Sequence, residues 1–251
     1  MVELKKCLIN LVGTSPMVVS EMVDFFKNDY QRDLRDVIFI ATKDERVVSG
    51  AYFAGSAIKS RFPDIRTHYE FLSSADIVED KDIVNFLDRI GSIVKNERDK
   101  YDVDKVYANI SGGRKVESVV LSNFSQLLGI DEVWIVINTQ ISNYNIEYEK
   151  ILNEISNFRE GENIQYYEEN KNKFDPIFFP DRKDLSFFQI PSIRYSIDDL
   201  KLLKTLLRGK DLENLYVPDY KLDAFISSRL IENNKKRSIP TEIGEVIFKY
   251  I

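Results

Sequence analysis

The sequence predicts an α/β protein built on a Rossmann-like, open parallel sheet, followed by a C-terminal winged helix-turn-helix domain. Two observations lead to this fold class. Short apolar runs typical of buried strands alternate with helical segments over the first 140 residues, and the pattern then changes after Asn138. Strand–helix alternation with short connections produces parallel strands joined by right-handed crossovers. We therefore expect residues 1–190 and 191–251 to form two domains.

The strands and helices of the first domain follow from apolar periodicity. Five strands are expected at Cys7–Val12, Val37–Ala41, Thr67–Leu72, Val106–Ile110 and Val133–Ile137, separated by helices at Met17–Lys27, Glu45–Arg61, Ile83–Arg98 and Val116–Leu128. After Asn138 the pattern indicates a helix at Asn145–Phe158. Short strands are expected at Gln165–Tyr167 and Ile177–Phe179, on either side of a polar loop at Glu168–Asp175, and another at Phe187–Ile190.

The C-terminal region has the pattern of a winged helix. Helices are expected at Ile197–Leu207 and Asp223–Ile231. The tail LIENNKKRSIPTEIGEVIFKYI then alternates an apolar strand, a polar turn, an apolar return strand and a capped helix.

Composition excludes several classes of chemistry. The 251 residues include one histidine, His68, and one cysteine, Cys7, which excludes a Cys/His zinc site within one chain, a disulfide framework and a two-histidine ribonuclease mechanism. The net charge of −6 does not favour a duplex-coating protein. With no apolar run long enough to span a membrane and no secretory signal, we expect a cytoplasmic protein that needs no cofactor and no metal.

Two turns follow predicted strands at the edge where ligands bind in such sheets. The first, Gly13-Thr14-Ser15-Pro16, has Pro16 for the first helical turn and Thr14 or Ser15 as a possible cap. The second, Ser111-Gly112-Gly113-Arg114-Lys115, places two cations at a helix start, where they oppose the helix dipole. A bound anion explains those cations, so we expect phosphate binding, although a capped loop without ligand is the plain alternative for the first turn.

At GTSPMVVSE and NISGGRKVES the chain resembles CARF domains, the Rossmann-like sensors of cyclic oligoadenylate in type III CRISPR defence. With the C-terminal winged helix it is most similar to the archaeal stand-alone CRISPR ring nucleases. The resemblance implies a homodimer that binds one ring of cyclic tetra-adenylate and cuts it without metal. The products would be linear di-adenylates with a 2′,3′-cyclic phosphate, and their formation would switch signalling off.

The resemblance also assigns roles to residues. Ser15 matches the serine of the first motif and would orient a ribose or phosphate near the cut. Gly13, Thr14, Ser111, Gly112, Gly113, Arg114 and Lys115 would bind the ligand. Family members carry a catalytic lysine on an insertion loop, and Lys171 and Lys173 are both candidates, with ordinary solvated lysines as the alternative.

Other functions stay open. A non-enzymatic CARF sensor could regulate transcription by binding DNA through the winged helix, where Lys235-Lys236-Arg237 lies in the expected wing turn. From Ile197 onward, 10 lysines and arginines face 9 acidic residues, a weak excess for reading DNA. Arg61 and His68 fit the spacing of a HEPN ribonuclease, but His68 belongs to a predicted strand. The absence of G-x-G-x-x-G argues against an NAD-binding Rossmann protein.

Overall fold

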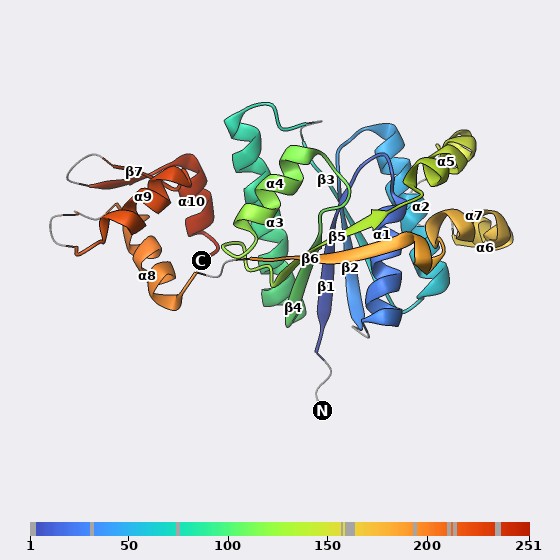
Figure 1. Ribbon diagram of the computed structural model, residues 1–251, viewed down its shortest axis with the longest axis horizontal. Coiled ribbons are helices and arrows are strands. Elements are labelled where there is room, and N and C mark those ends of the chain that lie inside the picture. Colours follow the sequence, from blue (N-terminus) through green and yellow to red (C-terminus); the bar gives the residue numbers. More distant parts are fainter. Residues whose placement is uncertain are drawn as a thin grey trace.

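A six-stranded sheet forms the centre of the molecule, as Figure 1 shows. The computed structural model describes residues 4–30, 33–73, 76–156, 158, 164–192, 195–209, 212, 215–233 and 237–251. The strands are β1 (Lys6–Val12), β2 (Leu34–Ala41), β3 (Arg66–Phe71), β4 (Lys105–Asn109), β5 (Glu132–Asn138) and β6 (Leu185–Ile190). Their order is β3-β2-β1-β4-β5-β6. The first five strands are parallel and β6 pairs antiparallel to β5, so the predicted open parallel sheet is confirmed with one antiparallel edge strand.

Helices cover both faces of the sheet and create two hydrophobic clusters (Figure 1). One face carries α1 (Met17–Asp24), α2 (Glu45–Arg61), α5 (Ile141–Ile155), α6 (Ile164–Glu169) and α7 (Lys171–Phe178); the other carries α3 (Asp80–Tyr101) and α4 (Lys115–Phe124). No helix in the described part of the chain is long and apolar enough to cross a membrane.

Strand β1 shows why the central strands are continuous apolar runs. Leu8 and Val12 contribute to one hydrophobic cluster, whereas Cys7, Ile9 and Leu11 contribute to the other. A parallel strand buried on both faces is apolar at nearly every position, and in β1 the buried amide of Asn10 is the exception. Burial raises the pKa of the Cys7 thiol well above its usual value, as is typical of an inert core thiol.

The two short strands and the polar loop predicted between residues 165 and 179 are wrong. This segment forms α6 and α7, and Pro176 is accommodated inside α7. Tyr167, Phe174 and Phe178 are fully buried and meet Phe53 of α2 with ring centroids 4.9–5.5 Å apart. Phe174 and Phe178 are four residues apart on one face of α7, and Tyr167 of α6 packs beside them. Tertiary packing of aromatic residues thus overrides the strand propensity that favoured the other prediction.

Several predicted helix boundaries also move. The helix expected at Met17–Lys27 ends as an α-helix at Asp24 and continues as a π-helical segment over Phe25–Asp29. The helix expected at Asp223–Ile231 is shifted to α9 (Asp219–Ser227), and Ile231 instead begins strand β7 (Ile231–Asn233). Arg229 there has a φ of 58°, a left-handed conformation that ends the helical path.

The C-terminal region packs against α3, beside the sheet (Figure 1). After β6 the chain forms α8 (Ile197–Leu206), α9, a hairpin of β7 and β8 (Ser238–Pro240), and α10 (Glu242–Phe248), which begins with the predicted cap from Thr241. A Cβ on Gly91 of α3 would lie 2.4 Å from the Tyr250 ring, so this glycine permits the close approach. Lys235 and Lys236 of the expected wing turn lie outside the described residues.

A buried carboxylate organises the amino-terminal edge of the sheet. The side chain of Asp36 of β2 has no exposed surface. It accepts two hydrogen bonds from Arg66 (2.7 and 2.9 Å) and one from Arg35 (2.6 Å), and its Oδ1 lies 3.1 Å from His68 Nε2. Burial raises the pKa of Asp36, but these hydrogen bonds outweigh burial and hold its pKa far below the usual value. His68 of β3 therefore belongs to a structural hydrogen-bonded cluster around Asp36 of β2.

Asp36→Asn should lower the free energy of unfolding at pH 7 by about 3 kcal/mol. This lies at the low end for a broken buried ion pair, because Arg66 and His68 are partly exposed. A carboxyl group whose pKa is lower in the folded state than in the unfolded state stabilises the fold above the unfolded-state pKa of about 4. This stabilisation is lost progressively as the pH falls below that value. Urea titrations should thus show the difference shrinking below pH 4. Asp64→Asn, at an exposed position, is the control, and an equal loss there would contradict the role of Asp36.

Candidate functional site

The two turns singled out in the sequence meet at the carboxyl edge of the sheet. β1 lies between β2 and β4, so the strand order reverses between β1 and β4. Residues 13–16 follow β1 and residues 111–115 lead from β4 into α4. In open α/β sheets the crevice at this reversal is where ligands bind.

Glycine permits the contact between the turns. A Cβ on Gly13 would lie 3.1 Å from the backbone nitrogen of Gly113, and a Cβ on Gly112 would lie 2.3 Å from the carbonyl oxygen of Leu11. Gly113 has a φ of 74°, in the left-handed region that side chains disfavour. The backbones of the two turns are therefore in direct contact, and other residues would force them apart.

Buried amides hold the turns from below. Asn10 of β1 and Asn109 of β4 are adjacent in the sheet, and Asn109 Nδ2 donates to Asn10 Oδ1 at 3.0 Å. Asn109 Oδ1 accepts from the backbone and the hydroxyl of Ser111, at 3.1 and 2.6 Å. The Ser111 hydroxyl also accepts from the Val136 N–H at 2.7 Å. Because these internal bonds use the hydroxyl, Ser111 shapes the turn, and we do not carry its side chain into the proposed site.

The start of α4 presents two cations to solvent. Glu117 Oε2 accepts from the backbone N–H of Arg114 at 2.8 Å, so the helix caps this amide with its own carboxylate. The guanidinium of Arg114 lies 3.5 Å from Asp76, and the side chains of both Arg114 and Lys115 are exposed. Burial raises the pKa of Glu117 above its usual value, and the hydrogen bond from the Arg114 N–H offsets only part of this rise.

A small cavity of about 110 Å³ lies between the two turns and the end of β2. Gly13, Thr14, Gly113 and Arg114 line one side, while Thr42 and the helix-capping Asp44 line the other. Four of the predicted ligand-binding residues thus lie together around one crevice, with Lys115 adjacent to Arg114. Their role in binding stays a prediction.

Ser15 contacts a helix that the sequence did not connect to the site. Its hydroxyl donates to Asn145 Oδ1 of α5 at 2.8 Å. Pro16 is the N-cap of α1, and no side chain caps this helix, so the expected cap from Thr14 or Ser15 is wrong. The Ser15 hydroxyl is instead oriented by α5.

Comparison with known proteins places the chain in a family. The family model of the CRISPR-associated protein NE0113 matches residues 15–218, most of the chain. The chain belongs to the CRISPR-associated NE0113 family. Its structure is similar to Csm6 of Enterococcus italicus bound to cyclic hexa-2′-fluoro-hexa-dAMP, with 16% identity and a TM-score of 0.46, over 98% of this chain and 53% of that one. The chain thus spans about half the length of that protein. No curated protein matches it.

This NE0113-family chain keeps both candidate catalytic lysines away from the turns. Lys171 Nζ donates to Ser60 Oγ at 3.4 Å, at the end of α2 opposite Asp44, and α2 is roughly 25 Å long. Lys173 pairs with Glu154, in the last turn of α5 and roughly 14 Å along the helix from Asn145. Helix α7 also replaces the insertion loop on which a catalytic lysine was expected. We therefore do not carry Lys171 or Lys173 into the proposed site.

Four residues at this candidate site were missed by sequence reasoning. Thr42 and Asp44 follow β2, and a third turn after a strand was a usable signal once β2 was placed beside β1. Asp76 and Asn145 carry no such signal, because each reaches the site from a segment distant in sequence.

A buried glutamate lies behind the first turn. Glu21 of α1 is 1% exposed, and its Oε1 accepts from Asn138 Nδ2 at the end of β5, at 2.8 Å. In the described part of the chain, Glu21 Oε2 has no hydrogen-bond partner. Burial raises the pKa of Glu21 to about 7, although the Asn138 hydrogen bond lowers it.

Glu21→Gln should raise the free energy of unfolding by roughly 3 kcal/mol at pH 8. This figure follows from the rise of the Glu21 pKa from 4.5 to about 7 on folding. The unfolded chain ionises this carboxyl near pH 4.5, so the folded state is penalised progressively above that pH and fully above pH 7. Urea titrations at pH 4.5 and 8 test this, with the exposed Glu168→Gln as control. An equal gain at both pH values would contradict it.

Tyr148 of α5 is buried against the first turn. Its hydroxyl has no hydrogen-bond partner among the residues that the structure describes. A Cβ on Gly50 of α2 would lie 2.5 Å from this hydroxyl and 3.1 Å from Pro16 Cγ, so Tyr148, Gly50 and Pro16 pack tightly. Buried Tyr167, by contrast, donates to Asp175 at 2.8 Å.

The two tyrosines should respond oppositely to loss of the hydroxyl. Tyr148→Phe should raise the free energy of unfolding by about 1 kcal/mol, because it removes an unpaired buried polar atom. Tyr167→Phe should lower it by about 1 kcal/mol, because it breaks a hydrogen bond. Thermal denaturation of both variants checks this, and a loss of stability in Tyr148→Phe would show that its hydroxyl is satisfied in solution.

Proposed function

We propose that the chain is a CRISPR-associated ring nuclease that binds cyclic tetra-adenylate at a homodimer interface and cleaves it without a metal. The observation that carries this proposal is the contact between the two turns at the strand-order reversal, beside Arg114 and Lys115. Membership of a CRISPR-associated family supports it. The Csm6 structure is named for a bound cyclic hexanucleotide analogue, but this likeness is too distant to carry the argument.

The cations of the second turn are suited to phosphates. The chain has a net charge of −6, yet Arg114 and Lys115 extend into solvent where glycine backbone also leaves room for a ligand. Glu117 accepts the hydrogen bond of the Arg114 N–H, so the binding groups in this proposal are the side chains of Arg114 and Lys115. A phosphate on the turn would displace the exposed Asp76 from Arg114.

The hydroxyl of Ser15 is oriented to accept a hydrogen bond. Because Ser15 donates its own hydrogen to Asn145, its lone pairs are left for a ribose 2′-OH. The 2′-oxygen would then attack the adjacent phosphorus and the bond from phosphorus to the 5′-oxygen would break. The 2′-OH proton ends on the departing 5′-oxygen, leaving a 2′,3′-cyclic phosphate. Catalysis in this scheme comes from orientation and charge stabilisation.

A second copy of the chain completes the proposed site. A cyclic tetranucleotide has rotational symmetry, so two identical subunits can make equivalent contacts and two equivalent cuts. Val116 and Val119 are 42% and 59% exposed on α4, directly beside Lys115. These apolar side chains would be covered if α4 lies near the two-fold axis.

The alternative is a non-enzymatic sensor of cyclic oligoadenylate that also binds DNA. The C-terminal order of helices and hairpin fits a proposed winged helix, and the exposed Arg237 directly precedes its return strand β8. The two functions share the same ligand turns and differ in whether the ring is cut. We favour the enzyme because Ser15 is held by a hydrogen bond from outside its own turn.

Incubation with labelled cyclic tetra-adenylate in excess EDTA, with products separated by chromatography, tests the proposal. We expect linear di-adenylate with a cyclic phosphate. Ser15→Ala should slow cleavage roughly 100-fold with little effect on binding, because it disturbs orientation. Arg114→Ala should weaken binding at least about tenfold. Lys100→Ala, in the last turn of α3, is the control. Binding with an intact ring would identify a sensor, and no binding would refute the proposal.

A further inference from the structure

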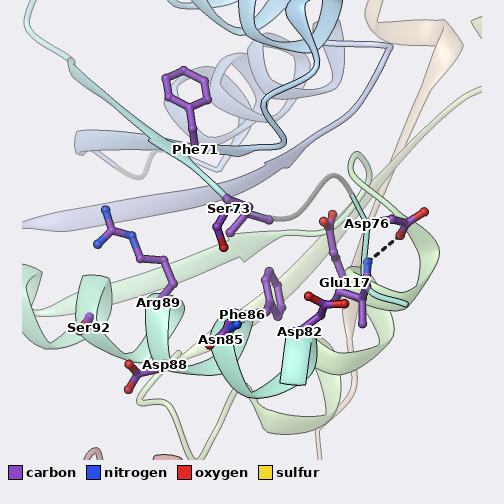
Figure 2. Close-up of a pocket in the computed structure, with 12 residues that line it drawn as sticks. Phe71, Ser73, Asp76, Asp82, Asn85, Phe86, Asp88, Arg89, Ser92 and Glu117 are labelled. Carbon is purple, nitrogen blue, oxygen red and sulfur yellow. Dashed lines mark hydrogen bonds between the residues drawn. The ribbon is translucent and has the colours of Figure 1, made fainter. Parts of the chain in front are cut away.

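A larger cavity lies beside the second turn and has no role in the phosphate contacts. It has a volume of about 370 Å³ and is enclosed by the end of β3, the first half of α3 and Glu117 of α4. Figure 2 shows Ser73 above the cavity, with Asn85 and Phe86 of α3 below it. Its size is within the range of sites for small organic ligands.

Two residues connect this cavity to the proposed phosphate site. Asp76 and Glu117 both line the cavity, and both contact Arg114. Asp76 lies 3.5 Å from the Arg114 guanidinium, and Glu117 accepts from the Arg114 backbone at 2.8 Å. A ligand whose phosphate rests on Arg114 thus has the cavity as its immediate neighbour.

The charge of the lining excludes phosphate from the cavity itself. Four carboxylates line it, from Asp76, Asp82, Asp88 and Glu117, against the single guanidinium of Arg89, which also pairs with Glu70 outside the cavity. An uncharged group that carries hydrogen-bond donors fits such a lining better than an anion does. Of a nucleotide's parts, the base meets this description.

The remaining lining fits a purine. Phe86 of α3 lies at the floor of the cavity and is 3% exposed, whereas the Phe71 ring points away from the cavity and packs on Tyr52 (Figure 2). Ser73 and Asn85 are exposed polar residues. In the described part of the chain, neither Ser73 nor Asn85 uses its side chain in a hydrogen bond to another residue. An amide can accept from the adenine amino group and donate to an adjacent ring nitrogen.

We propose that this cavity is an adenine pocket in which Asn85 reads the amino edge of one base of the bound ring. The inference rests on the proposed function and adds to it a determinant of base specificity. Arg114 then separates the two parts of the site, with phosphate on one side and base on the other. Ser73 supplies a second polar contact from the end of β3.

Binding of cyclic tetra-adenylate and cyclic tetra-inosinate, measured by calorimetry, tests the pocket. Inosine replaces the amino group of adenine with a carbonyl. The wild type should prefer the adenine ring at least about tenfold. Asn85→Asp keeps the size but loses the amide donor and adds charge, and should bind the adenine ring about tenfold more weakly. Asn85→Ala should lose the preference between the rings. Asn96→Asp, exposed on the same helix, is the matched control.

The outcomes separate this inference from the proposed function. Tight adenine-ring binding that neither Asn85 variant changes would overturn the pocket and leave the proposed function intact. If no ring binds, adenosine 5′-monophosphate at millimolar concentration provides the second measurement. Binding of the monophosphate that is lost in Asn85→Ala would retain the pocket and reject the ring as ligand. Absence of both would overturn both proposals.

Discussion

The contact between the two glycine turns is the constraint on which the carboxyl edge depends. A Cβ on Gly112 would meet the Leu11 carbonyl oxygen at 2.3 Å, so larger residues would separate β1 from β4 where the strand order reverses. Asn10 and Asn109 bind each other below this point and fix the spacing with buried hydrogen bonds. The direction of α4, and with it the position of Arg114, follows from that spacing.

The two edges of the sheet use charge in opposite ways. At the amino edge, the carboxylate of Asp36 is fully buried and accepts hydrogen bonds from Arg35 and Arg66. At the carboxyl edge, Arg114 and Lys115 stay exposed. Among the residues that the structure describes, Asp76 is the only carboxylate that forms an ion pair with Arg114. Stabilising ion pairs and ligand-accessible cations are thus separated by the length of the strands, so changes at one edge need not disturb the other.

The sequence predicted the sheet and the two turns because their signals are local. Buried parallel strands need uninterrupted apolar runs, and turns at their ends need glycine, proline and polar residues. Helices α6 and α7 were missed because Tyr167, Phe174 and Phe178 have strand propensity and become helical by packing on Phe53. The Ser15–Asn145 contact joins positions 130 residues apart, and no local pattern encodes it. The placement of both lysines of α7 likewise follows from tertiary packing.

Helix α3 is shared between the larger cavity and the C-terminal region. Asp88 and Ser92 line the cavity, while Asp88 also accepts from Lys249 at 2.9 Å and from Tyr250 at 2.8 Å. Gly91, between these contacts, leaves no clearance beneath the Tyr250 ring. A tilt of α3 would therefore change the width of the cavity and the packing of the chain's C-terminal residues at the same time.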